Sequence, residues 1–309
     1  MCLSGYIFTY LTDGHRVNVL RFWLNRILRL FPLLLFWGLA ASFYKLYKEH
    51  GVLLFHHFDK QLFIDKFSTV IGPSGAWTVF IELRYYLIFP IFLILLRRFN
   101  PGILIGLAII ILVVYRVSQW MEIGSIQGLS YGGIYGRADQ FLLGTMAFYV
   151  EKWIKNYPLK RNLIFNILGI VGFSGIIIFY QYFVLEGGYC NYNDEYPSKS
   201  IIWVFIPTLE GLFYSMIIIY YVQQKIPEKL DKIFSSVGKW SYSIYLGHFH
   251  LFPYIFLLIA TTVGMPGNFY GRFFIALLVF PLIVLFSSLT YKIIEKPFLR
   301  LRKNYLLPL

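Results

Sequence analysis

The fold is decided by residues Trp77–Leu96, which read W-T-V-F-I-E-L-R-Y-Y-L-I-F-P-I-F-L-I-L-L. As a helix these 20 residues rise about 1.5 Å each, which matches the ~30 Å hydrocarbon core of a bilayer. The stretch also carries one carboxylate, Glu82, and one guanidinium, Arg84. Because ionisable side chains are expensive in lipid, the stretch predicts a membrane-spanning helix that carries a functional residue.

The surroundings of Glu82 are predicted by helical spacing. Arg84 is two positions away, so a helix directs the two charges to nearly opposite sides and they do not neutralise each other. Tyr85 and Tyr86 follow by three and four positions, which brings their hydroxyls to the side of the carboxylate. We predict a hydrated, polar helix face around Glu82. A structural ion pair, or a protonated acid between helices, is the alternative interpretation.

Composition puts the whole chain in the same class as this stretch. Its 309 residues are 58% hydrophobic and 14% charged, and the mean hydropathy is +0.63. These values exclude a water-soluble domain and predict an all-α, polytopic transmembrane helical bundle, with residues 1–309 as a single membrane-embedded domain. Cys2 and Cys190 are too few for a disulfide framework and do not have the spacing of metal ligands.

The net charge of +13 would suit a nucleic-acid partner if the basic residues shared one surface. Instead, 19 of the 28 Lys and Arg residues lie in five alternate connections between apolar runs. This distribution is typical of positively charged loops on the cytoplasmic side of a membrane. We therefore expect a lipid bilayer as partner, no nucleic acid, and cytoplasmic basic connections. The oligomeric state is left open.

The apolar runs predict about eight full spans and an N-terminal half-span, Met1–Leu11. The expected full spans are 30–46, 77–96, 103–120, 138–150, 163–184, 201–222, 241–260 and 272–291. The run 138–150 is short and counts only if the residues that follow it snorkel to the membrane surface. Thr12–Arg29 is expected to be a basic connection. This topology places Met1 outside, so we expect one further helix ahead of it.

Six segments, in order along nearly the whole chain, are similar to motifs of one family. They are L-S-G-Y-I-F-T-Y-L (Leu3–Leu11), R-F-W-L-N-R-I-L-R-L-F-P (Arg21–Pro32), W-T-V-F-I-E-L-R-Y-Y-L-I-F-P (Trp77–Pro90), R-A-D-Q-F-L-L-G (Arg137–Gly144), W-S-Y-S-I-Y-L-G-H-F-H (Trp240–His250) and I-E-K-P-F (Ile294–Phe298). Together they resemble the integral-membrane acyltransferase 3 family, which includes bacterial O-antigen acetylases.

The resemblance implies a ten-helix, multi-pass enzyme of a bacterial cell membrane. Such an enzyme moves an acyl group, usually acetyl from cytoplasmic acetyl-CoA, to a hydroxyl of a cell-surface or lipid-linked glycan. By position, Arg26 and Arg29 match the family's Arg-x-x-Arg pair, Glu82 its tryptophan-led carboxylate, and Arg137 the arginine that opens its short helix. The family's first helix, which carries the histidine thought to be catalytic, has no counterpart here. We therefore expect an N-terminally truncated member.

The basic residues also have interpretations that do not need the family. Arg26 and Arg29, three apart, share a helix face and either anchor the helix at the inner membrane surface or clamp the phosphates of coenzyme A. Arg137 begins a helix, where the dipole is already positive, so we expect it to pair with Glu82 or an anionic substrate. Asp139 suits the first turn and is interpreted as a complement to the dipole.

Histidines supply the remaining candidates. His248 lies about 12 Å into its span and is either a packing residue or a base that accepts a proton near neutral pH. His50, His56 and His57 share a polar loop without further ligands at a fixed spacing, so no metal is expected. No Gly-x-Ser-x-Gly, P-loop or dinucleotide motif is present.

The sequence thus predicts a membrane O-acyltransferase. The residues of its site are catalytic Glu82 and His248, acyl-CoA-binding Arg26 and Arg29, and substrate-binding Arg84, Tyr86 and Arg137. Acyl-CoA is a substrate, and no tightly bound cofactor is expected. A base takes the proton of a sugar hydroxyl, the oxygen attacks the thioester carbonyl, and a cation steadies the oxyanion. The alternative is a non-catalytic remnant, or a transporter of glycan intermediates that uses the same polar path.

Overall fold

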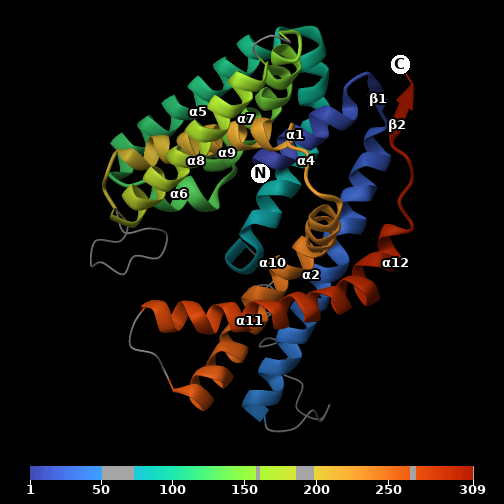
Figure 1. Cartoon of the computed structure of the whole chain (residues 1–309), viewed down its shortest axis with the longest axis vertical. Helices are drawn as coiled ribbons and strands as arrows, with labels where there is room; N and C mark the ends of the chain where they lie inside the picture. Colours follow the sequence, from blue (N-terminus) through green and yellow to red (C-terminus); the bar gives the residue numbers. More distant parts are fainter. Residues whose placement is uncertain (51–72, 158–160, 186–197, 265–268, 309) are drawn as a thin grey trace. The chain divides into compact units, whose positions relative to one another are not determined.

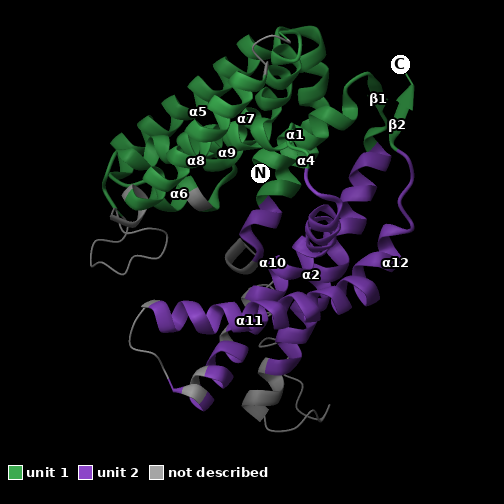
Figure 2. Ribbon diagram, in the orientation of Figure 1, with its two compact units in different colours: residues 1–19, 81–225, 305–309 green, residues 20–80, 226–304 purple. Residues whose placement is uncertain are grey.

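The computed structural model describes residues 1–50, 73–157, 161–185, 198–264 and 269–308, and these residues are almost entirely helical. They form two compact units (Figure 2). The first unit contains residues 1–19, 81–225 and 305–309, and the second contains residues 20–80 and 226–304. The expected all-α, polytopic bundle is confirmed.

Helix α7, Ile134–Ile154, is the centre of the first unit (Figure 1). The helices that pack most extensively against it are α1 (Cys2–Thr12), α5 (Pro101–Ile123), α6 (Gln127–Gly132) and α9 (Ile202–Tyr221). Helix α8, Arg161–Leu185, packs on α9. Helix α4, Pro73–Arg98, begins in the second unit and continues into the first. The arrangement places the polar residues of α7 at the centre of a helical bundle.

Small residues allow α1 and α7 to approach closely. A Cβ atom on Gly5 would collide with the carbonyl oxygen of Phe141, and one on Gly144 would collide with the carbonyl oxygen of Cys2. Thr9 and Thr145 form a hydrogen bond of 3.2 Å across the same interface. Glycine contacts and hydroxyl hydrogen bonds of this kind are typical of helix pairs in membranes.

This contact predicts that Gly144→Ala destabilises the protein by about 1–3 kcal/mol, because the backbone of α1 must move away from the new methyl group. Gly106→Ala in α5 is the matched control, since a Cβ there meets nothing within 4 Å. The control is expected to be neutral or to stabilise by up to about 1 kcal/mol through helix propensity. Denaturant unfolding in detergent measures the free energy of unfolding of both variants. Equal stabilities would contradict the close contact.

Helix α9 contains a proline whose missing donor is replaced by another helix. Pro207 has no N–H, so the carbonyl of Trp203, four residues earlier, lacks its helical partner. Ser130 on α6 donates its hydroxyl to that carbonyl at 2.8 Å. Gln127, also on α6, accepts a hydrogen bond from the backbone N–H of Ser198 at 2.7 Å. These bonds fix α6, and with it the start of α7.

Two short strands, which the sequence analysis did not anticipate, belong to the first unit. Strand β1, His15–Val17, pairs antiparallel with β2, Leu306–Pro308. Arg97, in the last turn of α4, donates to the carbonyl oxygens of Thr12 and His15. The strands and Arg97 therefore fix the connection that follows α1.

The second unit is formed by α2 (Val19–His50), the start of α4, α10 (Glu228–Val263) and α11 (Phe269–Thr290), followed by the π-helix η2 (Tyr291–Glu295) and α12 (Lys296–Leu299). Helix α10 packs on α11, and Tyr242 of α10 donates to the carbonyl of Leu30 on α2 at 2.7 Å. Helix α10 bends by 56° between His248 and His250.

Two expected boundaries differ from the structure. The predicted basic connection Thr12–Arg29 is helical from Val19 onward, so Arg26 and Arg29 lie within α2. The short run 138–150 lies within the 21-residue helix α7. In both cases charged residues interrupt the apolar pattern while the backbone stays helical.

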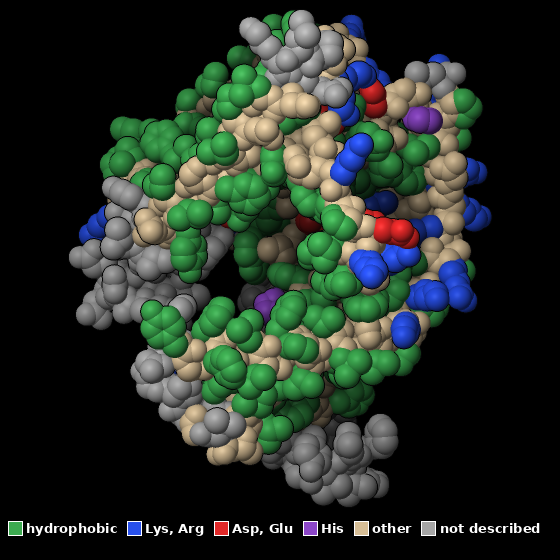
Figure 3. All heavy atoms as spheres, viewed as in Figure 1, with side chains coloured by type: hydrophobic (Ala, Val, Ile, Leu, Met, Phe, Trp, Pro, Cys, Tyr) green, Lys and Arg blue, Asp and Glu red, His purple; other side chains and the backbone are tan. Residues whose placement is uncertain are grey.

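Within the residues that the structure describes, six helices are long and apolar enough to cross a membrane, or seven if the bent α10 counts as one span. The predicted number of about eight is therefore not confirmed. Helix α5 exposes Ile103, Ile110 and Ile111 by 59–67%. Hydrophobic side chains cover much of the face seen in Figure 3. So much exposed apolar surface suits contact with lipid and marks a multi-pass membrane protein.

Candidate active site

Glu82 lies on α4, half-buried, and hydroxyl groups hold both of its oxygens. The hydroxyl of Ser4 on α1 donates to Oε1 at 3.2 Å, and the hydroxyl of Tyr86 donates to Oε2 at 2.8 Å. The prediction that Tyr86 stands beside the carboxylate is confirmed. Tyr85 lies elsewhere, with its ring stacked on Phe141 at 4.0 Å between centroids. Arg84 is exposed.

Arg137 forms a buried ion pair with α9. Its Nη1 lies 2.5 Å from Oε2 of Glu210, and Gln140, one turn further along α7, donates to the same oxygen at 2.9 Å. The side chains of Arg137 and Glu210 are only 3% and 15% exposed. The expectation that Arg137 pairs is correct, but Glu82 as its partner was wrong, because α9 supplies the carboxylate.

A second buried ion pair joins α5 to α7. Nη2 of Arg116 lies 2.9 Å from Oδ2 of Asp139, and both side chains are fully buried. Thr208 on α9 donates to the same carboxylate at 2.5 Å and accepts from Arg116 at 2.7 Å. The interpretation of Asp139 as a dipole complement was therefore wrong, since its carboxylate neutralises an arginine inside the bundle.

The first turn of α1 lies between the Glu82 group and the Glu210 group. Ser4 bonds Glu82, and the thiol of Cys2 donates to the carbonyl of Gly211, next to Glu210, at 3.6 Å. We name the residues around this turn the polar layer. It consists of Ser4, Glu82, Tyr86, Arg137, Gln140 and Glu210. The polar layer combines a carboxylate, a guanidinium and hydroxyl groups, which are groups that move protons and stabilise negative charge.

Glu82 differs from the other carboxylates of these helices. Among the described residues, its partners are hydroxyls only, whereas Asp139 and Glu210 are each engaged by an arginine. Glu151, also on α7, accepts from Tyr6 at 2.6 Å and pairs with Lys155 at 2.5 Å. Protonating Asp139 or Glu210 would leave a buried guanidinium without its counter-charge, which costs about 3–5 kcal/mol. Glu82 can take a proton without breaking an ion pair.

The remaining predicted site residues lie in the second unit. Arg26 and Arg29 are half-buried on the first turns of α2, and the guanidinium of Arg26 lies 5.4 Å from the ring centroid of Phe22. His248 is exposed at the bend of α10, 5.7 Å from the ring of Tyr245. Because Glu82 belongs to the first unit, its joint action with His248 stays a prediction.

Glu295 was not among the predicted site residues. It is the last residue of the π-helix η2 and only 1% exposed. Ser243 on α10 donates its hydroxyl to Oε1, and Thr290 donates to Ser243 at 3.2 Å. Arg29 and Arg302 both act on Glu295 electrostatically. Single π-helical turns are frequent at functional sites. The signal in the sequence was the motif I-E-K-P-F, whose glutamate received no role.

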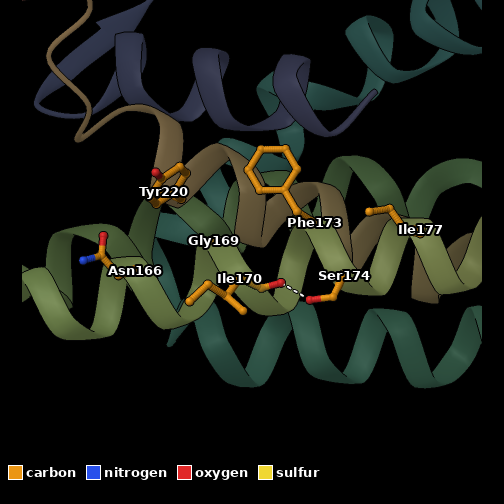
Figure 4. A pocket seen from close by; sticks show the side chains of 7 residues that line it. All are labelled: Asn166, Gly169, Ile170, Phe173, Ser174, Ile177 and Tyr220. Carbon is orange, nitrogen blue, oxygen red and sulfur yellow. Dashed lines mark hydrogen bonds between the residues drawn. The ribbon is translucent and has the colours of Figure 1, made fainter.

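A cavity of about 530 Å³ opens along α8 (Figure 4). Its lining residues are Asn166, Gly169, Ile170, Phe173, Ser174, Ile177 and Tyr220. They include no carboxylate, histidine or basic residue, and the hydroxyl of Ser174 donates to the carbonyl of Ile170 in its own helix. The cavity therefore lacks the groups that acid–base chemistry requires, and we do not assign it to the active site.

Across the described ranges, no three His, Cys, Asp or Glu residues come together as a metal site. His56, His57 and the side chain of His50 lie outside the described residues.

The model of the acyltransferase 3 family, described as an acyltransferase domain, matches residues 1–292. The chain is 25% identical to O-acetyltransferase OatA of Staphylococcus aureus strain NCTC 8325 over 96% of its length. A protein of strain COL with a provisional O-acetyltransferase name is also 25% identical over 96% of the chain. The chain spans about half of these relatives, 51% in both cases. No solved structure matches it.

Proposed function

The chain belongs to the acyltransferase 3 family, and from this premise we propose that it is a membrane O-acetyltransferase. Its donor is cytoplasmic acetyl-CoA and its acceptor is a hydroxyl of a cell-surface or lipid-linked glycan at a bacterial cell membrane. The names of the Staphylococcus aureus relatives support transfer of acetyl to oxygen. The family and the apolar helices support an enzyme embedded in lipid.

One observation carries the proposal. Glu82 lies in a helix long and apolar enough to cross a membrane, and only hydroxyls of the described residues hold its carboxylate. A hydroxyl that donates to a carboxylate occupies the position that an acceptor sugar hydroxyl would take. Ser4 or Tyr86 is therefore displaced, or joined, by the substrate hydroxyl, whose proton passes to Glu82.

The reaction then follows in one displacement. As Glu82 takes the proton, the acceptor oxygen bonds to the carbonyl carbon of the thioester, and a guanidinium steadies the negative oxygen. Arg137 is our candidate for that role, and Arg84 and Tyr86 orient the acceptor. The carbon–sulfur bond breaks, and the thiolate of coenzyme A leaves and is protonated, so Glu82 returns to the carboxylate form. His248 is the second candidate base.

Arg26 and Arg29 are the candidates for binding the donor. They lie three positions apart on one face of α2, and a guanidinium binds phosphate oxygens through two parallel hydrogen bonds. Two such groups at a membrane surface suit the phosphates of coenzyme A. This assignment concerns binding, so it predicts effects on KM rather than on kcat.

The test uses the purified chain in lipid vesicles, with acetyl-CoA and a lipid-linked saccharide extract, and measures release of the coenzyme A thiol and acetyl-ester formation. We expect acceptor-dependent thiol release. Arg29→Gln should raise KM for acetyl-CoA about tenfold or more through loss of a charge-assisted hydrogen bond, with a smaller change in kcat. Absence of thiol release by a folded chain would favour the alternative of a non-catalytic remnant or transporter.

A further inference from the structure

The chain after α12 is bound to the first turns of α2. Asn25, only 3% exposed, donates its amide to the carbonyl of Lys303 at 2.7 Å and accepts from the N–H of Lys303 at 3.2 Å. Arg21 donates to the carbonyl of Asn304 at 3.3 Å. This paired amide holds residues 302–304 against α2 as a neighbouring strand would. We name residues 300–304 the C-terminal strap.

The strap brings a third arginine to the donor-binding residues. Arg302 directly precedes Lys303, which Asn25 holds, and Arg29 follows Asn25 by four positions on the same face of α2. Arg302 is half-buried, as are Arg26 and Arg29, whereas Arg300, two positions earlier, is exposed. Burial therefore distinguishes Arg302 from Arg300 within the strap.

Glu295 adds a negative charge to this group. It acts electrostatically on both Arg29 and Arg302, and its Oε1 is held by Ser243, which Thr290 supports. Oε2 is buried and accepts no hydrogen bond from the described residues. A fixed, buried carboxylate attracts both guanidiniums and offsets part of their mutual repulsion.

The charge of the cluster suits a phosphate group. Three guanidiniums and one carboxylate leave two net positive charges. Figure 3 shows Lys and Arg side chains gathered near α12 and the strap. A phosphate monoester carries close to two negative charges at neutral pH, and forked guanidiniums match its oxygens. A lone carboxylate would bind such a site less strongly.

We infer that Arg302, placed by Asn25 and Glu295, completes with Arg26 and Arg29 a binding site for a phosphate-bearing ligand. The inference rests on the proposed function, in which that ligand is the coenzyme A part of the donor. Arg302 binds the phosphate directly, and Glu295 is a positioning residue. An anionic lipid headgroup has the same phosphate chemistry and is the competing source.

The experiment measures binding of coenzyme A by calorimetry to the full chain in phosphatidylcholine nanodiscs. We expect Arg302→Gln to weaken binding about 10- to 100-fold, since it removes a charged hydrogen-bond donor. Arg302→Lys keeps the positive charge but loses the planar, forked donor geometry of the guanidinium. Its affinity for coenzyme A should therefore lie between those of the wild type and Arg302→Gln. Arg300→Gln removes the same charge from an exposed position and should change binding less than about twofold.

Glu295→Gln tests the positioning role by the direction in which it changes the affinity for coenzyme A. If Glu295 were only a negative charge near the site, its removal would tighten binding of coenzyme A. If it positions Arg29 and Arg302, binding weakens, and Glu295→Asp restores part of it. We expect the weakening, and tighter binding by the folded variant would overturn the positioning role.

The outcomes separate this inference from the proposed function. Normal coenzyme A binding by Arg302→Gln would overturn the role of Arg302 and leave the donor assignment intact. Failure of the folded wild-type chain to bind coenzyme A would reject the donor itself. Replacing part of the phosphatidylcholine with phosphatidylglycerol tests whether an anionic lipid headgroup is the ligand. If phosphatidylglycerol displaced coenzyme A from the wild type but had no such effect on Arg302→Gln, the site would be assigned to lipid headgroups instead.

Discussion

Glu82→Gln is expected to lower kcat for acetyl transfer by about 10²- to 10⁴-fold, the usual contribution of a positioned general base. Glutamine keeps an oxygen that accepts from Tyr86 or Ser4, whose bonds to Glu82 are 2.8 and 3.2 Å long, but it cannot take a proton. The free energy of unfolding should therefore change by no more than about 1 kcal/mol. Acetyl-ester formation and unfolding are measured on the same preparation.

The matched control for this variant is Glu122→Gln, which removes an exposed carboxylate near the end of α5. It should leave kcat within about twofold of wild type, because a solvent-exposed charge on another helix contributes little to the energetics of the site. If Glu82→Gln retained kcat within tenfold of wild type, the assignment of the base would pass to His248. The corresponding His248→Gln variant would then show the larger loss.

Asp139→Ala is expected to destabilise the protein by about 3–5 kcal/mol, because it leaves the guanidinium of Arg116 buried without its counter-charge. Both side chains of this pair are 0% exposed, so water cannot replace the carboxylate. Thr208 stays as a neutral partner of Arg116 and does not compensate for the charge. Denaturant unfolding in detergent, followed by circular dichroism, measures the loss.

Two further variants test whether the loss of stability comes from the buried, unpaired charge. The double variant Arg116→Met with Asp139→Leu removes both charges and should recover most of the stability. Glu228→Ala breaks an ion pair with Lys232 whose side chains are 81% and 73% exposed, and should cost less than about 1 kcal/mol. If Asp139→Ala cost no more than Glu228→Ala, the pair would not be the structural contact described.

The sequence was sufficient where the relevant distances are local. Segment length and composition predicted the class of fold, and four-residue spacing placed Tyr86 beside Glu82, because both follow from the geometry of one helix. Helix α2 shows the limit of the same reasoning. Its first turns carry Arg21, Arg26 and Arg29, so a pattern based on apolar runs ends the helix at the charges, while the backbone continues.

Contacts between helices could not be predicted in the same way. Arg137 and Glu210 are 73 positions apart, and Arg116 and Asp139 are 23 apart. Spacing within a helix relates residues only three or four positions away. The sequence did contain a signal, because Arg116 and Glu210 lie inside expected spans, where any ionisable residue is a functional or pairing candidate. Applying that rule to every span would have identified both, though not their partners.

We propose two roles for the carboxylates of these helices: Glu82, held by hydroxyls, acts in the reaction, whereas Asp139, paired with Arg116, stabilises the bundle. The most direct test is kcat per folded molecule, with the folded fraction determined for each preparation. We predict that Glu82→Gln lowers kcat per folded molecule by at least about 10²-fold and that Asp139→Ala retains most of the wild-type value. Equal losses per folded molecule, or a larger loss for Asp139→Ala, would contradict the claim.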